Sequence, residues 1–86
     1  MKLTLRDLLL VPPQVIELVP ESVARESLVL PLRQDSDHLE LAVSDTGDME
    51  TLEKLRFILS RSIRPREARV EDLAAAIDHH YGPKSQ

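Results

Sequence analysis

Five arginines in one short segment are the side chains of this sequence best suited to binding chemistry. They are Arg56, Arg61, Arg64, Arg66 and Arg69, and residues 54–69 as a whole carry six basic groups and one acidic group, a net charge of +5. Guanidinium groups pair with phosphates and carboxylates through two hydrogen bonds at once. We therefore treat the five arginines as a candidate site for a phosphate-containing ligand or an acidic partner. The alternative is a solvated surface that nearby carboxylates neutralise.

A second candidate site is an apolar run close to the start of the chain, directly before two prolines. It consists of Leu8, Leu9, Leu10 and Val11. A helix that covers a core needs apolar residues on one face only, and this run is apolar all round. It is therefore a candidate apolar contact for a partner protein. The alternative is that it caps the core of the chain itself.

The residue types that catalysis usually needs are missing or badly spaced. The chain has no cysteine and only two glycines, Gly47 and Gly82, which excludes thiolate chemistry and glycine-rich phosphate loops. His79 and His80 are adjacent, and neighbours on a helix point about 100° apart, so the pair suits the negative end of a helix dipole better than a metal ion. We expect a non-enzymatic chain with no catalytic residues, metal or cofactor.

The composition is that of an ordinary globular domain. Hydrophobic residues make up 42% and charged residues 30% of the 86 residues, and we expect residues 1–86 to form a single domain. The net charge is −4 and the only aromatic residues are Phe57 and Tyr81, which argues against nucleic-acid binding. No apolar run reaches the roughly 20 residues that span a bilayer, and no signal peptide is recognisable. We therefore expect a cytoplasmic chain without direct membrane insertion.

Short helices are expected ahead of the candidate sites. A capping-box spacing from Thr4 to Asp7 predicts a helix that ends before Pro12. Pro13 is suited to open a short helical turn, and Pro20 to open a further helix. Alternating apolar residues then predict strands at 28–32 and 38–43, which form an antiparallel hairpin with Pro31 on an edge strand.

The second half of the chain predicts a crossover. Asp48 is a suitable N-cap for a helix with an apolar stripe of Met49, Leu52, Leu55, Ile58 and Leu59. A weak strand follows at 63–68. The last helix would bury Val70, Leu73, Ala74, Ile77 and Tyr81, would stop at Gly82-Pro83, and would leave a frayed tail at 84–86. The predicted fold class is α+β: a small three-stranded mixed sheet, made of a β-hairpin and one crossover strand, packed with three to four helices.

The ordered set of these patterns resembles the N-terminal domain of the ATPases that drive type II secretion and type IV pilus assembly. The matching segments are Val15–Ala24, Leu30–Leu32, Leu39–Asp45, Leu52–Leu59, Ile63–Pro65 and Ala75–Gly82. The resemblance is strongest over residues 15–82. The family usually has a proline after the aspartate that leaves the hairpin, whereas here Asp45 is followed by Thr46-Gly47.

The resemblance implies a non-catalytic module that docks onto an inner-membrane platform protein or onto the rest of an ATPase. Such a chain would sit in the cytoplasm and reach the inner membrane through its partner. In some related ATPases this region binds cyclic di-GMP through an opening Arg-Leu-Gly motif, and residues 1–14 contain no glycine. Two alternatives stay open: a nucleotide-sensing regulatory domain that uses the arginines, and a free-standing, self-associating domain. An acidic half at residues 1–53 beside the basic segment is compatible with a homo-oligomer.

Overall fold

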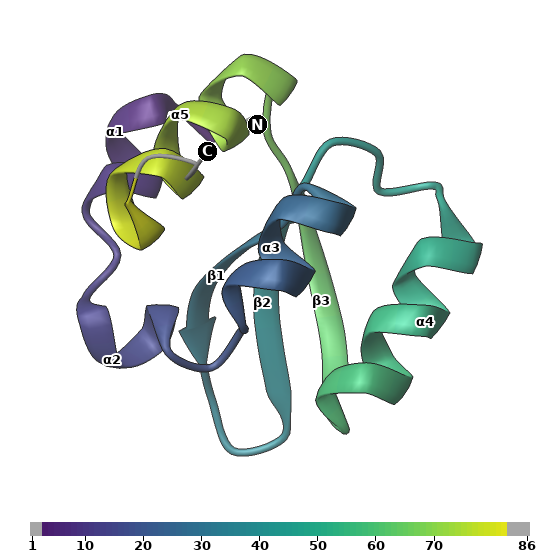
Figure 1. The fold of residues 1–86 in the computed structure, drawn as a ribbon. Helices are drawn as coiled ribbons and strands as arrows, with labels where there is room; N and C mark the ends of the chain where they lie inside the picture. The colour runs from purple at the N-terminus through teal and green to yellow at the C-terminus, as the bar shows by residue number, and fades with distance from the viewer. Residues whose placement is uncertain (1–2, 83–86) are drawn as a thin grey trace.

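The computed structural model describes residues 3–82, and its elements follow the order predicted from the sequence (Figure 1). Three helices come first: α1 (Leu5–Leu9), α2 (Pro13–Ile16) and α3 (Glu21–Ser27). They are followed by strands β1 (Leu30–Gln34) and β2 (His38–Val43), helix α4 (Met49–Leu59), strand β3 (Ser62–Glu67) and helix α5 (Val70–Tyr81). The tail predicted to fray, residues 84–86, lies outside the described residues.

The three strands form one mixed sheet in the order β1-β2-β3. β1 and β2 are antiparallel and make the predicted hairpin, whereas β3 runs parallel to β2 after the crossover through α4. Pro31 lies on β1, which is an edge strand, and the register of the hairpin shifts between Pro31 and Arg33. The α+β fold class predicted from the sequence is therefore confirmed.

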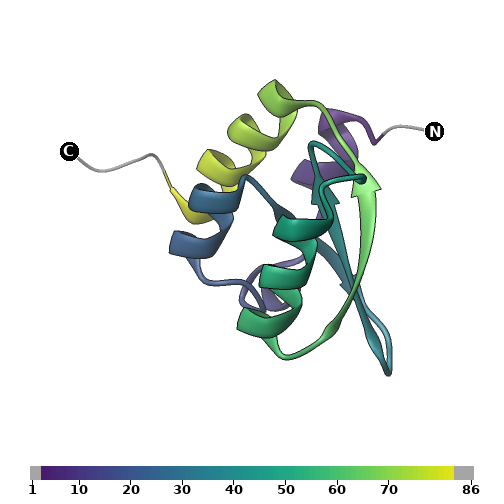
Figure 2. The same cartoon turned by 90° about the vertical axis from the view of Figure 1, so that its right-hand side faces the viewer.

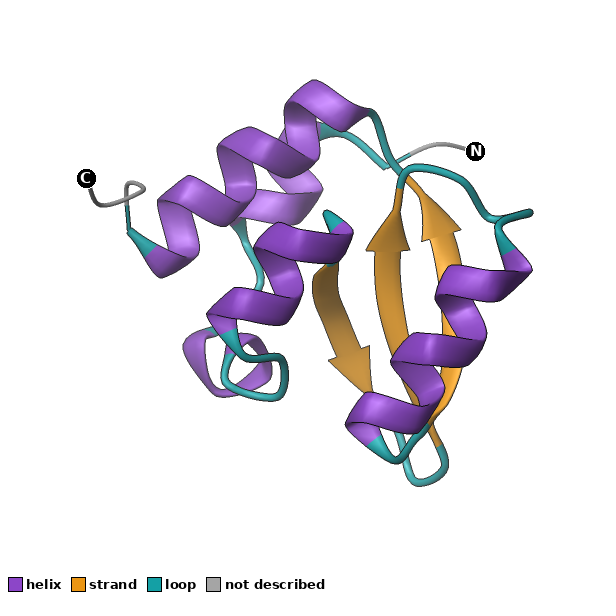
Figure 3. Cartoon of the chain, turned by 45° about the vertical axis from the view of Figure 1, so that its right-hand side comes forward, coloured by secondary structure: helices purple, strands orange, loops and turns teal. Residues whose placement is uncertain are grey.

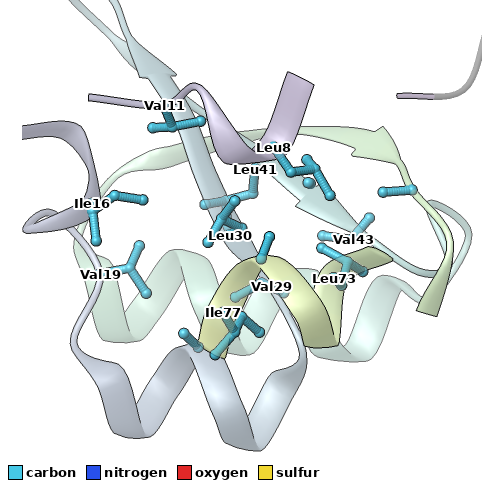
Figure 4. Packing of buried hydrophobic residues seen from close by; sticks show 14 of the residues in the cluster. Leu8, Val11, Ile16, Val19, Val29, Leu30, Leu41, Val43, Leu73 and Ile77 are labelled. Carbon is cyan, nitrogen blue, oxygen red and sulfur yellow. The ribbon is translucent and has the colours of Figure 1, made fainter. Parts of the chain in front are cut away.

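The helices gather mainly on one side of this sheet. Figure 2 shows α3, α4 and α5 on the same side, and Figure 3 shows α4 crossing in front of the parallel strands. The core between these layers is aliphatic, and Figure 4 shows its residues converging from both termini and from the sheet. Leu39, Leu41, Leu55 and Leu73 are fully buried. No polar or charged residue is buried among residues 3–82, so the interior supplies packing and no chemistry.

Local capping chemistry explains where the helices begin and end. Thr4 and Asp7 form the predicted capping box, in which each side chain accepts the other residue's backbone N–H. Asp48 caps α4 by accepting the N–H of Thr51 at 3.2 Å. At the other ends, Leu28 closes α3 and Ser60 closes α4 in the left-handed conformation, both with φ 54°. This conformation reverses the chain direction but is unfavourable for residues other than glycine.

The last turn of α5 is tied to three earlier helices by side chains. His80 Nε2 lies 2.7 Å from the carbonyl oxygen of Leu8. The hydroxyl of Tyr81 donates to the carbonyl of Val19 at 2.8 Å, just after α2. On α3, the guanidinium of Arg25 donates to Asp78 at 2.8 Å and also to the carbonyl of Gly82. The end of α5 thus holds the N-terminal helices against the sheet.

Several sequence-based boundaries and faces need correction. The first strand was predicted at 28–32 but lies at Leu30–Gln34, because Leu28 is used as the left-handed cap of α3. On α5 the buried small residue is Ala76 instead of Ala74, and Val70 is 55% exposed. Within residues 3–82 no helix has the length and apolar character needed to cross a bilayer.

Candidate docking surface

The acidic residues of the described chain mainly serve local structure. The carboxylate of Asp35 accepts backbone N–H bonds from Asp37 and His38, which lowers the pKa of Asp35. Hydrogen bonds from the Thr51 side chain and backbone lower the pKa of Asp48 in the same way. In both cases the hydrogen bonds stabilise the charged carboxylate that accepts them. Among residues 3–82 no group of three His, Asp or Glu residues is arranged to hold a metal ion.

Four of the five candidate arginines have a carboxylate partner on the surface. The pairs are Arg56–Glu53 at 3.6 Å, Arg64–Asp35 at 3.8 Å, Arg66–Glu40 at 3.3 Å and Arg69–Glu71 at 2.9 Å. Arg61 is the exception, since it forms no ion pair with any carboxylate in the part of the chain that the structure describes. The pairs of Arg56, Arg64 and Arg69 are exposed and contribute about 0–1 kcal/mol each, so they exchange readily for a partner's groups, whereas Glu40 is only 16% exposed.

The structure divides the five arginines between different surfaces. Arg64 and Arg66 alternate on β3 and share a sheet face with Glu40, opposite the face where Leu39 and Leu41 are buried. Arg69 follows β3 at the start of α5. Arg56 and Arg61 instead line one hollow at the end of α4. The segment is thus not a single basic cluster.

The hollow at the end of α4 is built around an exposed aromatic ring. Helix α4 turns Leu55 into the core and therefore points Phe57, about 200° further round the helix, away from it. Phe57 is 85% exposed. The left-handed turn at Ser60 then folds the chain back beside the ring. The hollow has a volume of about 510 Å³ and is lined by Glu53, Arg56, Phe57, Ser60, Arg61 and Ser62. We call this surface the Phe57 corner.

Further apolar side chains on α4 extend this exposed character. The predicted apolar stripe included Met49 and Ile58, but these two are 62% and 43% exposed. They lie at the margins of the buried helix face, whereas Leu55 lies near its centre. Phe57 was not among the residues singled out from the sequence as a site. Its position on the helical wheel, opposite Leu55, is the signal that would have found it.

The apolar run before the two prolines is divided between the core and the surface. Leu8 and Val11 are buried in the core, Leu9 is partly buried against it, and Leu10 is 69% exposed. The capping bond from Leu10 to the carbonyl of Arg6 holds that exposed side chain at the end of α1. Any partner would therefore meet Leu10 and part of Leu9, while Leu8 and Val11 act in packing.

The two adjacent histidines lie on α5 beside this region. Their rings meet edge to face with centroids 5.0 Å apart, and His80 is engaged with the Leu8 carbonyl. Burial raises the pKa of the neighbouring Tyr81 to about 12. A shallow hollow of about 360 Å³ passes over these residues; its lining is Pro13, Ile16, Glu17, His79, His80 and Tyr81.

Known proteins resemble this chain over nearly its whole length. The type IV pilus assembly ATPase PilB of Myxococcus xanthus (strain DK1622) is 30% identical over 74 residues, which cover 86% of this chain and 13% of PilB. The solved structure of MshE with cdg has a TM-score of 0.80 at 26% identity, and the match covers 93% of this chain and 58% of that chain. The N-terminal domain of XpsE matches with a TM-score of 0.76 at 14% identity, over 93% of this chain and 56% of that chain, and shows the shared fold alone.

These comparisons confirm the resemblance drawn from the sequence. The chain spans only a small part of PilB, a type IV pilus assembly ATPase, and just over half of the two solved chains. It corresponds to the MshEN part of such proteins and not to the catalytic ATPase domain. Because the MshEN domain matches residues 2–86, the chain belongs to the MshEN domain family.

Proposed function

We propose that residues 1–86 act as one docking domain, which attaches a type II secretion or type IV pilus assembly ATPase to a protein partner. The partner would be the cytoplasmic part of an inner-membrane platform protein, so the domain would work in the cytoplasm at the membrane surface. The observation that carries this proposal is the Phe57 corner. The only phenylalanine of the chain is 85% exposed, next to an arginine that forms no ion pair among the described residues.

Phe57 contributes little to the stability of the isolated domain. Full burial of a phenylalanine side chain is worth about 1.5–3 kcal/mol, and almost none of that is realised here. Interfaces, by contrast, draw most of their binding energy from a few aromatic and arginine side chains near their centre. Phe57, Arg56 and Arg61, which line the same hollow, are such a set.

The test is a direct binding measurement with the cytoplasmic fragment of a platform protein encoded in the same genome. Calorimetry would compare the wild-type domain with Phe57→Ala and with the matched control Val70→Ala, which removes an exposed apolar side chain elsewhere. We expect Phe57→Ala to weaken binding at least tenfold and Val70→Ala to change it less than twofold. Equal binding by Phe57→Ala would remove the Phe57 corner from the interface. Failure of the wild-type domain to bind any platform fragment would refute the docking function.

A second candidate function is sensing of a cyclic dinucleotide. It is supported by the likeness to MshE, whose solved structure contains cdg, and by the arginines of β3. Arg64 and Arg66 are exposed, and their carboxylate partners lie 3.8 Å and 3.3 Å away, so phosphates could displace them. Calorimetry with cyclic di-GMP should then give saturable, salt-sensitive heat that Arg64→Ala reduces. No heat at millimolar ligand would dispose of this alternative.

A further inference from the structure

The lining of the Phe57 corner limits what it can bind. All of its residues lie between Glu53 and Ser62, on α4, in the turn that follows and at the first residue of β3. No residue from any other part of the described chain lines the opposite side. Small-molecule sites normally bury roughly 70–90% of the ligand surface, which requires residues from several secondary-structure elements around the ligand. A surface contacted from one side suits a segment of another polypeptide instead.

The charges of the Phe57 corner define the sign of that segment. Arg61 forms no ion pair within residues 3–82, and Arg56 holds Glu53 only at 3.6 Å, with both side chains more than 60% exposed (63% and 66%). A pair so exposed contributes at most about 1 kcal/mol, so a partner carboxylate could compete for Arg56. The lining of the Phe57 corner itself carries two arginines, Arg56 and Arg61, and one carboxylate, Glu53. A complementary partner is therefore acidic.

The aromatic ring adds a second requirement. Phe57 lines the hollow together with Arg56 and Arg61 and is 85% exposed, so its apolar surface stays in water until an apolar group covers it. A carboxylate alone would satisfy Arg61 but leave this ring exposed. The partner must present an apolar side chain within a residue or two of its acidic groups.

We propose that the Phe57 corner binds an acidic segment of a protein partner in which an aromatic or aliphatic side chain covers Phe57 and a neighbouring carboxylate pairs with Arg61. This inference rests on the proposed docking function and adds to it the chemistry of the bound segment. Charge complementarity selects the acidic segment, and the exposed ring selects its apolar anchor.

The probe is a displayed library of random 16-residue peptides, selected in parallel on four forms of the folded domain. These are the wild type, Phe57→Ala, Arg61→Glu and, as a control, Val70→Ala. The wild type and the control should enrich peptides in which Asp or Glu flanks an aromatic or aliphatic residue. Phe57→Ala should recover such peptides at least tenfold less well, and Arg61→Glu should lose the preference for acidic residues. Circular dichroism would establish that all four proteins are folded.

Each other outcome overturns the inference. These outcomes are no enrichment on the wild type, enrichment of basic or uncharged peptides, or equal recovery on Phe57→Ala. Sedimentation provides a further check: a wild-type dimer that Phe57→Ala dissociates would identify a second copy of this chain as the occupant instead. The docking function fails separately, when a platform fragment does not bind a domain that still selects acidic peptides.

Discussion

Two neighbouring residues of α4 offer a sharp test of the division between core and contact surface. Leu55 is completely buried and Phe57 is 85% exposed, although only one residue separates them. Truncating Leu55 to alanine removes buried methyl groups and leaves a cavity, which typically costs about 2–5 kcal/mol. Truncating Phe57 removes less than a fifth of the burial that a core phenylalanine would have, so the expected cost is below about 0.5 kcal/mol.

Urea denaturation followed by circular dichroism at 222 nm measures both effects, since helical signal is lost on unfolding. A domain of this size should have an m-value of about 1 kcal/mol/M, so a loss of 3 kcal/mol lowers the midpoint by about 3 M. Leu55→Ala should therefore be strongly destabilised or unfolded in the absence of urea. Phe57→Ala should unfold within about 0.5 M of the wild type.

A loss of more than about 1 kcal/mol in Phe57→Ala, with an unchanged m-value, would refute this reasoning. It would mean that the Phe57 ring packs against the domain in solution and is not available to a partner. Met49→Ala serves as a matched control, because Met49 lies on the same helix and is 62% exposed. Its unfolding midpoint should match that of Phe57→Ala.

Three further predictions concern ionisation and backbone strain. Folding raises the pKa of Tyr81 from 10.0 to about 12. The protonated hydroxyl therefore stabilises the fold fully below pH 10, and this contribution is lost as the pH rises toward 12. Tyr81→Phe should flatten the resulting alkaline decline in the urea midpoint. The pKa of Asp48 is lowered by its cap, so stability should fall as the pH drops below about 4, and Asp48→Asn should reduce that acid sensitivity. Ser60 has φ 54°, so Ser60→Gly should raise the free energy of unfolding by about 0.5–1 kcal/mol, measured by urea denaturation; an unchanged midpoint would mean that Ser60 carries no strain.

The order of the elements was predictable because each has a local cause in the sequence. The capping box at Thr4, the N-cap at Asp48 and the prolines at 12, 13 and 20 act within a few residues. The alternation of Leu39, Leu41 and Val43 likewise predicts their common buried face. Such signals depend on neighbours along the chain, so they do not require the tertiary fold.

The candidate sites were less predictable because they depend on tertiary packing. Elements that are distant in the sequence bury Leu8 and Val11, and the composition of the run alone does not reveal this burial. Leu28 continues the apolar alternation of the predicted strand, yet it closes α3 in the left-handed conformation. The exposure of Phe57 follows from helical periodicity, because Phe57 lies opposite Leu55 on the helical wheel, whereas the hollow that it shares with Arg61 depends on the turn at Ser60.

The hydrogen bonds of the α5 terminus also bear on the order in which the domain can be made. His80 reaches a carbonyl 72 residues earlier, and Tyr81 reaches one 62 residues earlier. On a ribosome the N-terminal helices therefore emerge long before the groups that hold them, and loop closure over such distances must wait until α5 has been made. A nascent chain arrested before residue 78 should be digested rapidly by protease, whereas one extended past residue 82 and free of the exit tunnel should resist. Equal resistance of the two would show that the N-terminal helices are held without α5.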